Sequence, residues 1–232
     1  MSLPLVVAIT GASGAVYAVR LLEVLREAGV DVHLVISPSG AAVIKQELGV
    51  DIDLVRFRPD SLLPSAADSA ADPKIAAVRH LAGVSTGDSS VLPVATKAPG
   101  EIIYHYHTNF MSPIASGSFL TRGMVVCPCS GSTMSGIAHG SSTNLVQRAA
   151  DVHLKEHRRL VLVPRETPLS TIQLENMRIA AQAGAVVLPA MPGWYHGVKS
   201  LQDLIDFIVA RILDQLEVPH TLMRRWGDSA ST

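Results

Sequence analysis

The sequence predicts an α/β fold, in which a doubly wound and mostly parallel sheet is covered by helices on both faces. Two observations predict this class. Short, continuous apolar runs recur along the chain, as expected for strands buried on both faces. Segments with apolar residues at helical spacing separate these runs. Strand, helix and strand in this order form right-handed parallel units, so we expect a flavodoxin- or Rossmann-like three-layer sandwich.

The expected elements follow one another in chain order. The first apolar run ends at Gly11, and the helical pattern after it ends at Gly29. The expected strands lie at 5–10, 32–36, 124–127, 160–163 and 185–188, and the expected helices at 14–27, 37–48, after 133, about 144–156, 171–182 and 201–216. In the last helix, Asp203, Asp206 and Asp214 lie opposite the apolar stripe, as on a polar face.

Residues 51–106 interrupt the alternation of strands and helices. The segment is rich in Pro, Ser, Ala and Asp and shows only short periodic pieces. A structureless connection of this length is unusual inside a compact domain. We therefore interpret it as an insert with a strand or two of its own. The insert belongs to a single domain over residues 1–232, whose C-terminal tail is 217–232.

The composition favours a globular protein that associates with itself. Of 232 residues, 48% are apolar and 17% are charged, which is rich in apolar residues for a soluble monomer. We expect other subunits to cover part of the apolar surface. The net charge of −1 and the scattered basic residues do not predict nucleic-acid binding. Apolar runs of strand length predict no membrane span, and the N-terminus lacks a basic signal region, so we expect a cytoplasmic location.

No metal site is expected from the cysteines and histidines. Cys127 and Cys129 are too close in sequence for a good disulfide and too few for a tetrahedral zinc site, so they are interpreted as buried apolar residues. His105 and His107 could share one strand face, but no third ligand follows at a useful spacing. The Asp-rich motif of diphosphate-dependent prenyl synthases is absent, so magnesium is not expected either.

Small and hydroxyl residues follow three of the expected strands, at 10–14, 37–39 and 128–133. Ligands bind beyond the carboxyl ends of strands in such sheets, and helix N-termini there attract phosphate. Ordinary turn and cap chemistry could explain any one of these turns, but all three together favour a phosphate site. The first turn does not fit a dinucleotide fingerprint, because Ala15 and Val16 stand where its last glycine should be.

Several charged residues near expected strand ends are candidate site residues. Arg148, Lys155, Arg165 and Arg211 could bind a second phosphate or a carboxylate. Arg148 and Lys155 share a helix face with Asp151, so a simple surface ion pair is an equal alternative.

Two carboxylates, Glu166 and Glu47, differ in what the sequence indicates about them. Glu166, directly after a buried strand, is a candidate general acid or base or, equally, a charge that complements a helix dipole. Glu47 gives no such signal by itself.

Together these segments resemble the UbiX/Pad family of flavin prenyltransferases. The resemblance covers the first fifty residues and most of 111–227, whereas 51–106 matches poorly. It rests on 9–15, 128–130, 144–145, 148–151, 154–156, 160–168 and 185–195.

The resemblance implies a role for each matching residue. The FMN site would consist of Gly11, Ala12, Ser13, Ser37, Ser130, Gly131, Ser132, Thr133 and Arg165. The site for dimethylallyl phosphate would consist of Ser116, Gly117, Ser118, Arg148, Lys155, Tyr195, Arg211 and Trp226, with Phe110 where some relatives have Trp against the flavin. The catalytic residues would be Glu47, Lys155 and Glu166.

The same resemblance implies an activity and partners. The protein would transfer a dimethylallyl group to N5 and C6 of reduced FMN, without metal. The prenylated FMN would pass to a UbiD-type decarboxylase, and the enzyme would be a homododecamer. Two alternatives stay open: a flavoprotein that decarboxylates cysteine-derived peptides, and a non-catalytic flavin-carrying subunit of an aromatic-acid decarboxylase.

Overall fold

The computed structural model describes residues 3–63, 98–195, 197–223 and 225. Its six strands form one parallel sheet in the order β3-β2-β1-β4-β5-β6. The strands are β1 (Leu5–Ile9), β2 (Val32–Ile36), β3 (Ile102–His105), β4 (Gly123–Cys129), β5 (Arg159–Pro164) and β6 (Val186–Val187). The α-helices are α1 (Ala15–Glu27), α2 (Pro38–Leu48), α3 (Pro59–Leu62), α5 (Gly131–Ala138), α6 (Leu145–Lys155), α7 (Thr171–Gln182) and α8 (Leu201–Gln215).

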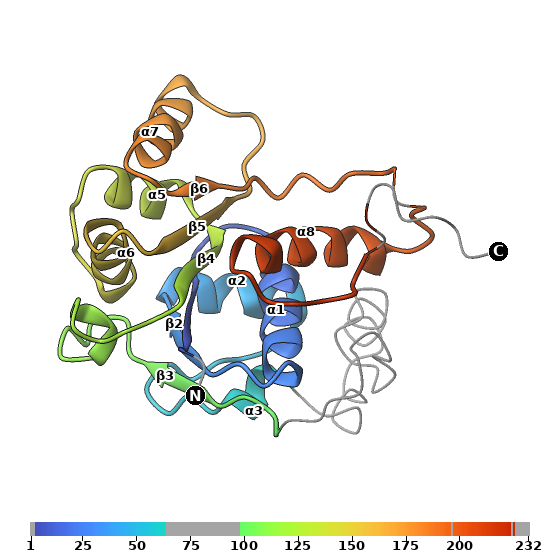
Figure 1. Ribbon diagram of the computed structural model, residues 1–232, viewed down its shortest axis with the longest axis horizontal. Coiled ribbons are helices and arrows are strands. Elements are labelled where there is room, and N and C mark those ends of the chain that lie inside the picture. Colours follow the sequence, from blue (N-terminus) through green and yellow to red (C-terminus); the bar gives the residue numbers. More distant parts are fainter. Residues whose placement is uncertain (1–2, 64–97, 196, 224, 226–232) are drawn as a thin grey trace.

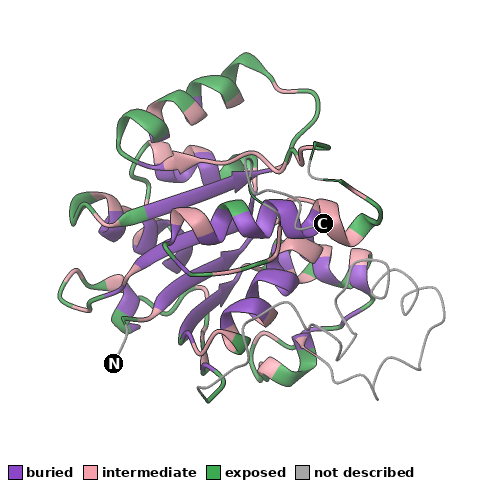
Figure 2. Ribbon diagram, turned by 45° about the vertical axis from the view of Figure 1, so that its right-hand side comes forward, coloured by how far each residue is buried: buried purple, intermediate pink, exposed green. Residues whose placement is uncertain are grey.

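Helices cover both faces of the sheet, which confirms the predicted fold class. Helices α1, α2 and α8 pack on one face, and α5, α6 and α7 pack on the other (Figure 1). Within β1, alternate side chains enter the two cores: Val7 and Ile9 face α1, whereas Val6 and Ala8 face the opposite layer. The central strands are accordingly buried along their length (Figure 2). This double burial explains the continuous apolar runs in the sequence.

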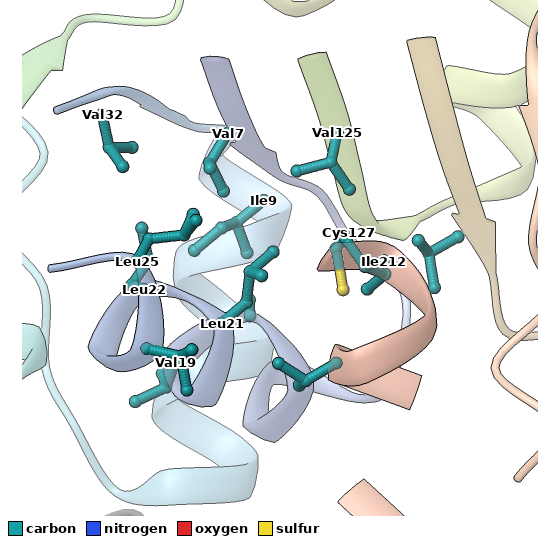
Figure 3. Packing of buried hydrophobic residues seen from close by; sticks show 14 of the residues in the cluster. Val7, Ile9, Val19, Leu21, Leu22, Leu25, Val32, Val125, Cys127 and Ile212 are labelled. Carbon is teal, nitrogen blue, oxygen red and sulfur yellow. The ribbon is translucent and has the colours of Figure 1, made fainter. Parts of the chain in front are cut away.

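The core between the sheet and α1 is aliphatic. Val7 and Ile9 lie above Leu21 and Leu22 of α1, and Cys127 of β4 points into the same layer (Figure 3). Both Cys127 and Cys129 are buried free thiols, as predicted. Burial raises the pKa of the Cys129 thiol to about 12, so this thiol is not a nucleophile at neutral pH.

The described part of the insert contains two elements. Helix α3 lies near its start, and edge strand β3, at Ile102–His105, lies at its end and is the one strand of the insert among the described residues. Residues 64–97 lie outside the described part of the chain. Tyr104 of β3 donates a hydrogen bond from its hydroxyl to the carbonyl of Leu54 (3.1 Å), which ties the start of the insert to the sheet.

A buried ion pair joins α1 to α8 and corrects the expectation for Asp206. The Nε of Arg20 lies 2.8 Å from Oδ1 of Asp206, and Arg20 is 1% exposed. Asp206 therefore faces the first helix rather than solvent. Glu23 adds a second carboxylate 3.4 Å from the same guanidinium. Burial raises the pKa of Glu23 to about 7, and the nearby Arg20 partly offsets this rise.

We predict that Glu23→Gln stabilises the protein at alkaline pH. The folded-state pKa of about 7 exceeds the ordinary 4.5, so folding favours the protonated carboxyl. The cost of the ionised form grows as the pH rises from about 4.5 to 7 and is complete above that range. At pH 8 the variant should gain up to about 3 kcal/mol, and at pH 5 the gain should fall to about 1 kcal/mol or less. Urea unfolding at both pH values measures this.

Glu175→Gln is the matched control, because Glu175 lies exposed on α7 beside Arg178. It should show no gain at pH 8. A gain for Glu23→Gln that is equal at both pH values would contradict the prediction.

Candidate active site

The turns after β1 and β4 meet where the strand order changes direction, which is the usual ligand-binding position in such sheets. Thr10 joins them. Its hydroxyl donates a hydrogen bond to the carbonyl of Pro128 (2.8 Å) and accepts one from the backbone N–H of Ser130 (2.9 Å). The Thr10 N–H also donates to Pro128 (3.2 Å). Because Thr10 is 1% exposed, water competes little for these bonds.

The turn after β2 packs against the same point. The N–H of Ser37 donates to the carbonyl of Ile9 (3.0 Å), and a Cβ on Gly11 would collide with the Cβ of Ser39. Only glycine therefore allows this close approach of the two turns. The structure thus brings together the turns that contain Gly11, Ala12, Ser13, Ser37 and Ser130 to Thr133.

The turn after β4 presents clustered hydroxyls at a helix N-terminus. Ser130 is the N-cap of α5, and its hydroxyl accepts a hydrogen bond from the N–H of Thr133 (3.3 Å). The same hydroxyl lies 3.2 Å from that of Ser132. The N-terminus of a helix with adjacent hydroxyls fits a phosphate. These residues fit the phosphate-bearing flavin FMN.

Arg165 brings a cation to the same rim. It follows β5, and its Nε lies 3.5 Å from the carbonyl oxygen of Ser13, so the side chain reaches past the end of β4 to the first turn. A guanidinium here can pair with a phosphate or donate hydrogen bonds to a polar edge of a flavin.

Glu47 caps helix α1, a role that the sequence did not reveal. Its carboxylate accepts hydrogen bonds from the N–H of Gly14 (3.0 and 3.1 Å) and of Ala15 (2.8 Å). Gly14 has φ 107° and is an N-cap without a side chain of its own to accept these bonds. Glu47 thus occupies the anion position at this helix N-terminus. The first turn therefore does not offer these two amides to a phosphate.

Glu166 lies exposed just beyond β5, and both of its carboxylate oxygens are held. Oε1 accepts a hydrogen bond from the N–H of Thr167 (3.2 Å), and Oε2 accepts one from Nε2 of Gln173 (3.2 Å). A small cavity of about 50 Å³ beside it is lined in part by Arg165, Met177 and Met191. A carboxylate fixed next to an apolar hollow can take or give a proton at a bound reactant.

A second group of predicted residues surrounds Gly117. The hydroxyls of Ser116 and Ser118 are 2.9 Å apart, and Nε of Arg148 donates to the carbonyl of Ala115 (3.1 Å). A Cβ on Gly117 would lie 2.9 Å from Nζ of Lys155. We call Ser116, Gly117, Ser118, Arg148 and Lys155 the serine-loop group.

The ion pairs of Arg148 and Lys155 agree in part with the alternative that these residues form simple surface pairs. Asp151 pairs with Arg148 (3.0 Å) rather than with Lys155, and Lys155 pairs with Glu156.

Tyr195, in the loop before α8, and Arg211 of α8 form a third group. The Tyr195 ring packs edge-on against Phe207, with ring centroids 5.9 Å apart. Arg211 follows Phe207 by one helical turn, hence on the same face, and pairs with Asp214 (2.8 Å). Trp226 lies outside the described residues. Phe110 is described and is exposed.

One chain does not bring the serine-loop group to the turns after β1, β2 and β4. Lys155 precedes β5 and Glu166 follows it, so the six residues of that strand separate them by about 20 Å. A cavity of about 470 Å³ also lies at the start of β5, where it is lined in part by Arg122, His157 and Arg159. It is therefore at the opposite end of the strands from Ser130.

The chain matches known proteins over nearly its whole length. Residues 2–213 match the family described as Flavoprotein. A flavin prenyltransferase UbiX from Halalkalibacterium halodurans is 44% identical over 222 residues, which cover 96% of this chain and 92% of that relative. The chain belongs to the UbiX family of flavin prenyltransferases.

Solved structures of UbiX proteins share the fold. The crystal structure of AnUbiX (PadA1) in complex with FMN and dimethylallyl pyrophosphate aligns with TM-score 0.74 at 35% identity, over 99% of this chain and 100% of that one. A dodecameric FMN-dependent UbiX-like decarboxylase from Escherichia coli O157:H7 aligns with TM-score 0.72 at 36% identity, over 96% of this chain and 98% of that one.

The described residues contain no group of three or more His, Cys, Asp or Glu placed to hold a metal. His105 instead stacks on His33, with Nδ1 of His33 2.7 Å from Nε2 of His105. Burial lowers the pKa of His105 to about 4. The same part of the chain has no helix both long and apolar enough to span a membrane.

Two residues of the candidate site are not predicted by the sequence. Thr10 belongs to the expected first turn, but its bridge to the turn after β4 depends on how the two strands pair. Gln173 stands three residues after Ser170, and this capping-box spacing predicts the helix start but not the contact with Glu166.

We predict that Glu47→Ala destabilises the first turn and weakens FMN binding. Removing the cap leaves the N–H groups of Gly14 and Ala15 without their acceptor, at a cost of about 1–2 kcal/mol. Thermal unfolding of the FMN-free protein and an FMN titration measure the two effects. Gln46→Ala, an exposed neighbour on α2, is the control. Unchanged stability and FMN affinity in Glu47→Ala would show that the cap is dispensable.

Proposed function

We propose that this protein transfers the dimethylallyl group of a dimethylallyl phosphate to N5 and C6 of reduced FMN and releases prenylated FMN. The observation that carries the proposal is the meeting of the hydroxyl-rich turns with Arg165 at the switch point of a UbiX-family sheet. FMN would be held by these turns, with the hydroxyls and N–H groups at the N-terminus of α5 binding its phosphate. When bound and reduced, FMN supplies an electron-rich nucleophile, its N5 atom.

The protein's own residues stabilise the leaving phosphate and exclude water. The Arg148 guanidinium and Lys155 ammonium, with Tyr195 and Arg211, bind the phosphate as its negative charge develops. Apolar side chains around the allylic group keep water from the electron-poor carbon. Glu166 takes the proton that must leave when the new ring closes, at the carboxylate oxygens held by Thr167 and Gln173.

The complete site is shared between copies of the chain. The serine-loop group lies at the other end of β5 from Glu166, so a neighbouring subunit supplies it. Large apolar side chains are exposed, among them Met111 (92%), Ile172 (74%) and Trp194 (70%), and association would cover them. Following the dodecameric relative, the assembly is a homododecamer.

The product serves a partner enzyme. Prenylated FMN passes to a UbiD-type decarboxylase, and the reaction takes place in the cytoplasm. The enzyme needs no metal, because guanidinium and ammonium groups neutralise the phosphate.

The test is to incubate the protein with reduced FMN and either dimethylallyl phosphate or the diphosphate, and to measure the mass of the flavin by mass spectrometry. We predict a mass increase of one dimethylallyl group. Lys155→Ala and Glu166→Gln should keep FMN but lose about 100- to 1000-fold in rate. Lys45→Ala, an exposed lysine paired with Asp51, is the control and should stay active. Flavin of unchanged mass with the unmodified chain would refute the proposal, leaving the decarboxylase or flavin-carrier alternative.

Mixed assemblies test whether the site is shared. If Lys155 and Glu166 of one site come from different chains, assemblies refolded from Lys155→Ala and Glu166→Gln chains should regain about a quarter of the sites. A site built within one chain regains none. Light scattering should give twelve times the chain mass of 24.6 kDa.

A further inference from the structure

Gln173, in the first turn of α7, holds the carboxylate of Glu166, which lies in the loop after β5. Its Nε2 donates a hydrogen bond to Oε2 of Glu166 at 3.2 Å, and its Oε1 accepts one from the N–H of Ser170 at 2.8 Å. The second bond fixes the orientation of the Gln173 amide, because the N–H of Ser170 needs an acceptor and only the amide oxygen can accept. The donor end of the amide therefore always points at Glu166.

The same side chain also lies against the predicted flavin turn. A Cβ on Gly131 would lie 3.4 Å from Nε2 of Gln173. Helices α5 and α7 pack together at this point, so Gln173 links the turn after β4 to the loop after β5. Its amide thus has three neighbours: the cap of its own helix, the start of α5 and the Glu166 carboxylate.

We propose that Gln173 is the positioning residue for Glu166. Thr167 and Gln173 hold one carboxylate oxygen each, which sets the plane and direction of a side chain that is otherwise exposed. An exposed carboxylate without such partners samples several rotamers, and only some of them reach a bound reactant. The inference rests on the proposed function, because it assigns Gln173 a role through Glu166.

Gln173→Glu is the decisive variant. A glutamate at this position keeps the capping box, because Glu and Gln both accept from the N-cap backbone. It replaces the donor that faces Glu166 by a second carboxylate oxygen, which repels Glu166 from its position. We expect a 10- to 100-fold slower formation of prenylated FMN, as misplacing a reacting group by about 1 Å can cost. The melting temperature should stay as in the unmodified protein. Turnover is compared at saturating FMN, because the added charge lies beside the N-terminus of α5 and weakens binding of the FMN phosphate.

Ser170→Ala is the matched control, since it removes the hydroxyl that accepts from the N–H of Gln173 (3.2 Å) but leaves the backbone donor to Oε1. It should lower the melting temperature and leave turnover within about threefold. In a Glu166→Gln background, Gln173→Glu should cause no further loss, because both changes remove the same function.

Three results would overturn the inference. In the first, Gln173→Glu forms product as fast as the unmodified protein. In the second, it slows turnover as much in the Glu166→Gln background as in the unmodified protein. In the third, it weakens FMN binding but leaves turnover at saturating FMN intact, which would confine the role of Gln173 to flavin binding. If the unmodified protein forms no prenylated FMN, the proposed function fails and this role falls with it. Normal product formation with an unaffected Gln173→Glu variant refutes the positioning role alone.

Discussion

The contact between Thr10 and the turn after β4 is the constraint on which the site depends. Two neighbouring parallel strands end at the switch point, and their turns would diverge toward α1 and α5 on opposite faces of the sheet. One buried hydroxyl, bonded to Pro128 and Ser130, holds them side by side. The hydroxyls of α5, the packing of Gly11 and the reach of Arg165 all presuppose this arrangement.

The two glutamates near these turns show how position decides chemistry. Glu47 and Glu166 are both carboxylates beside the carboxyl ends of strands. Glu47 accepts the hydrogen bonds of the N–H groups of Gly14 and Ala15, which need an outside acceptor because the N-cap of α1, Gly14, has no side chain. Glu166 meets one backbone N–H and one side-chain amide and stays exposed. The first builds the turn, and the second is accessible to a reactant.

Parallel β/α architecture also explains why one chain holds only part of the proposed site. Helix α6 runs back along the sheet, so its last residue, Lys155, lies where β5 begins and not where it ends. The cations that neutralise a leaving phosphate and the turns that fit a flavin therefore lie at opposite ends of the same layer. Self-association then becomes a requirement of the proposed chemistry and not an accessory to it.

The sequence by itself determined the parallel sheet, most element boundaries and the hydroxyl-rich turns that favour a phosphate, because each is a local signal. Apolar runs mark doubly buried strands, and N-caps such as Ser37 and Ser170 mark helix starts, whereas α5 begins at Gly131, a few residues before the expected start after 133. The functional residues of the serine-loop group came from family resemblance, since spacing alone left a surface ion pair equally open.

Only the tertiary structure decided which distant residues meet. The sequence places Asp206 on the polar face of its helix. In the structure α8 packs on α1, and Asp206 pairs there with Arg20, which lies 186 positions earlier. Glu47 becomes a cap and Gln173 a partner of Glu166 for the same reason. Periodicity fixes the face that a side chain occupies on its own helix, but the partner on that face depends on how the helices pack over the sheet.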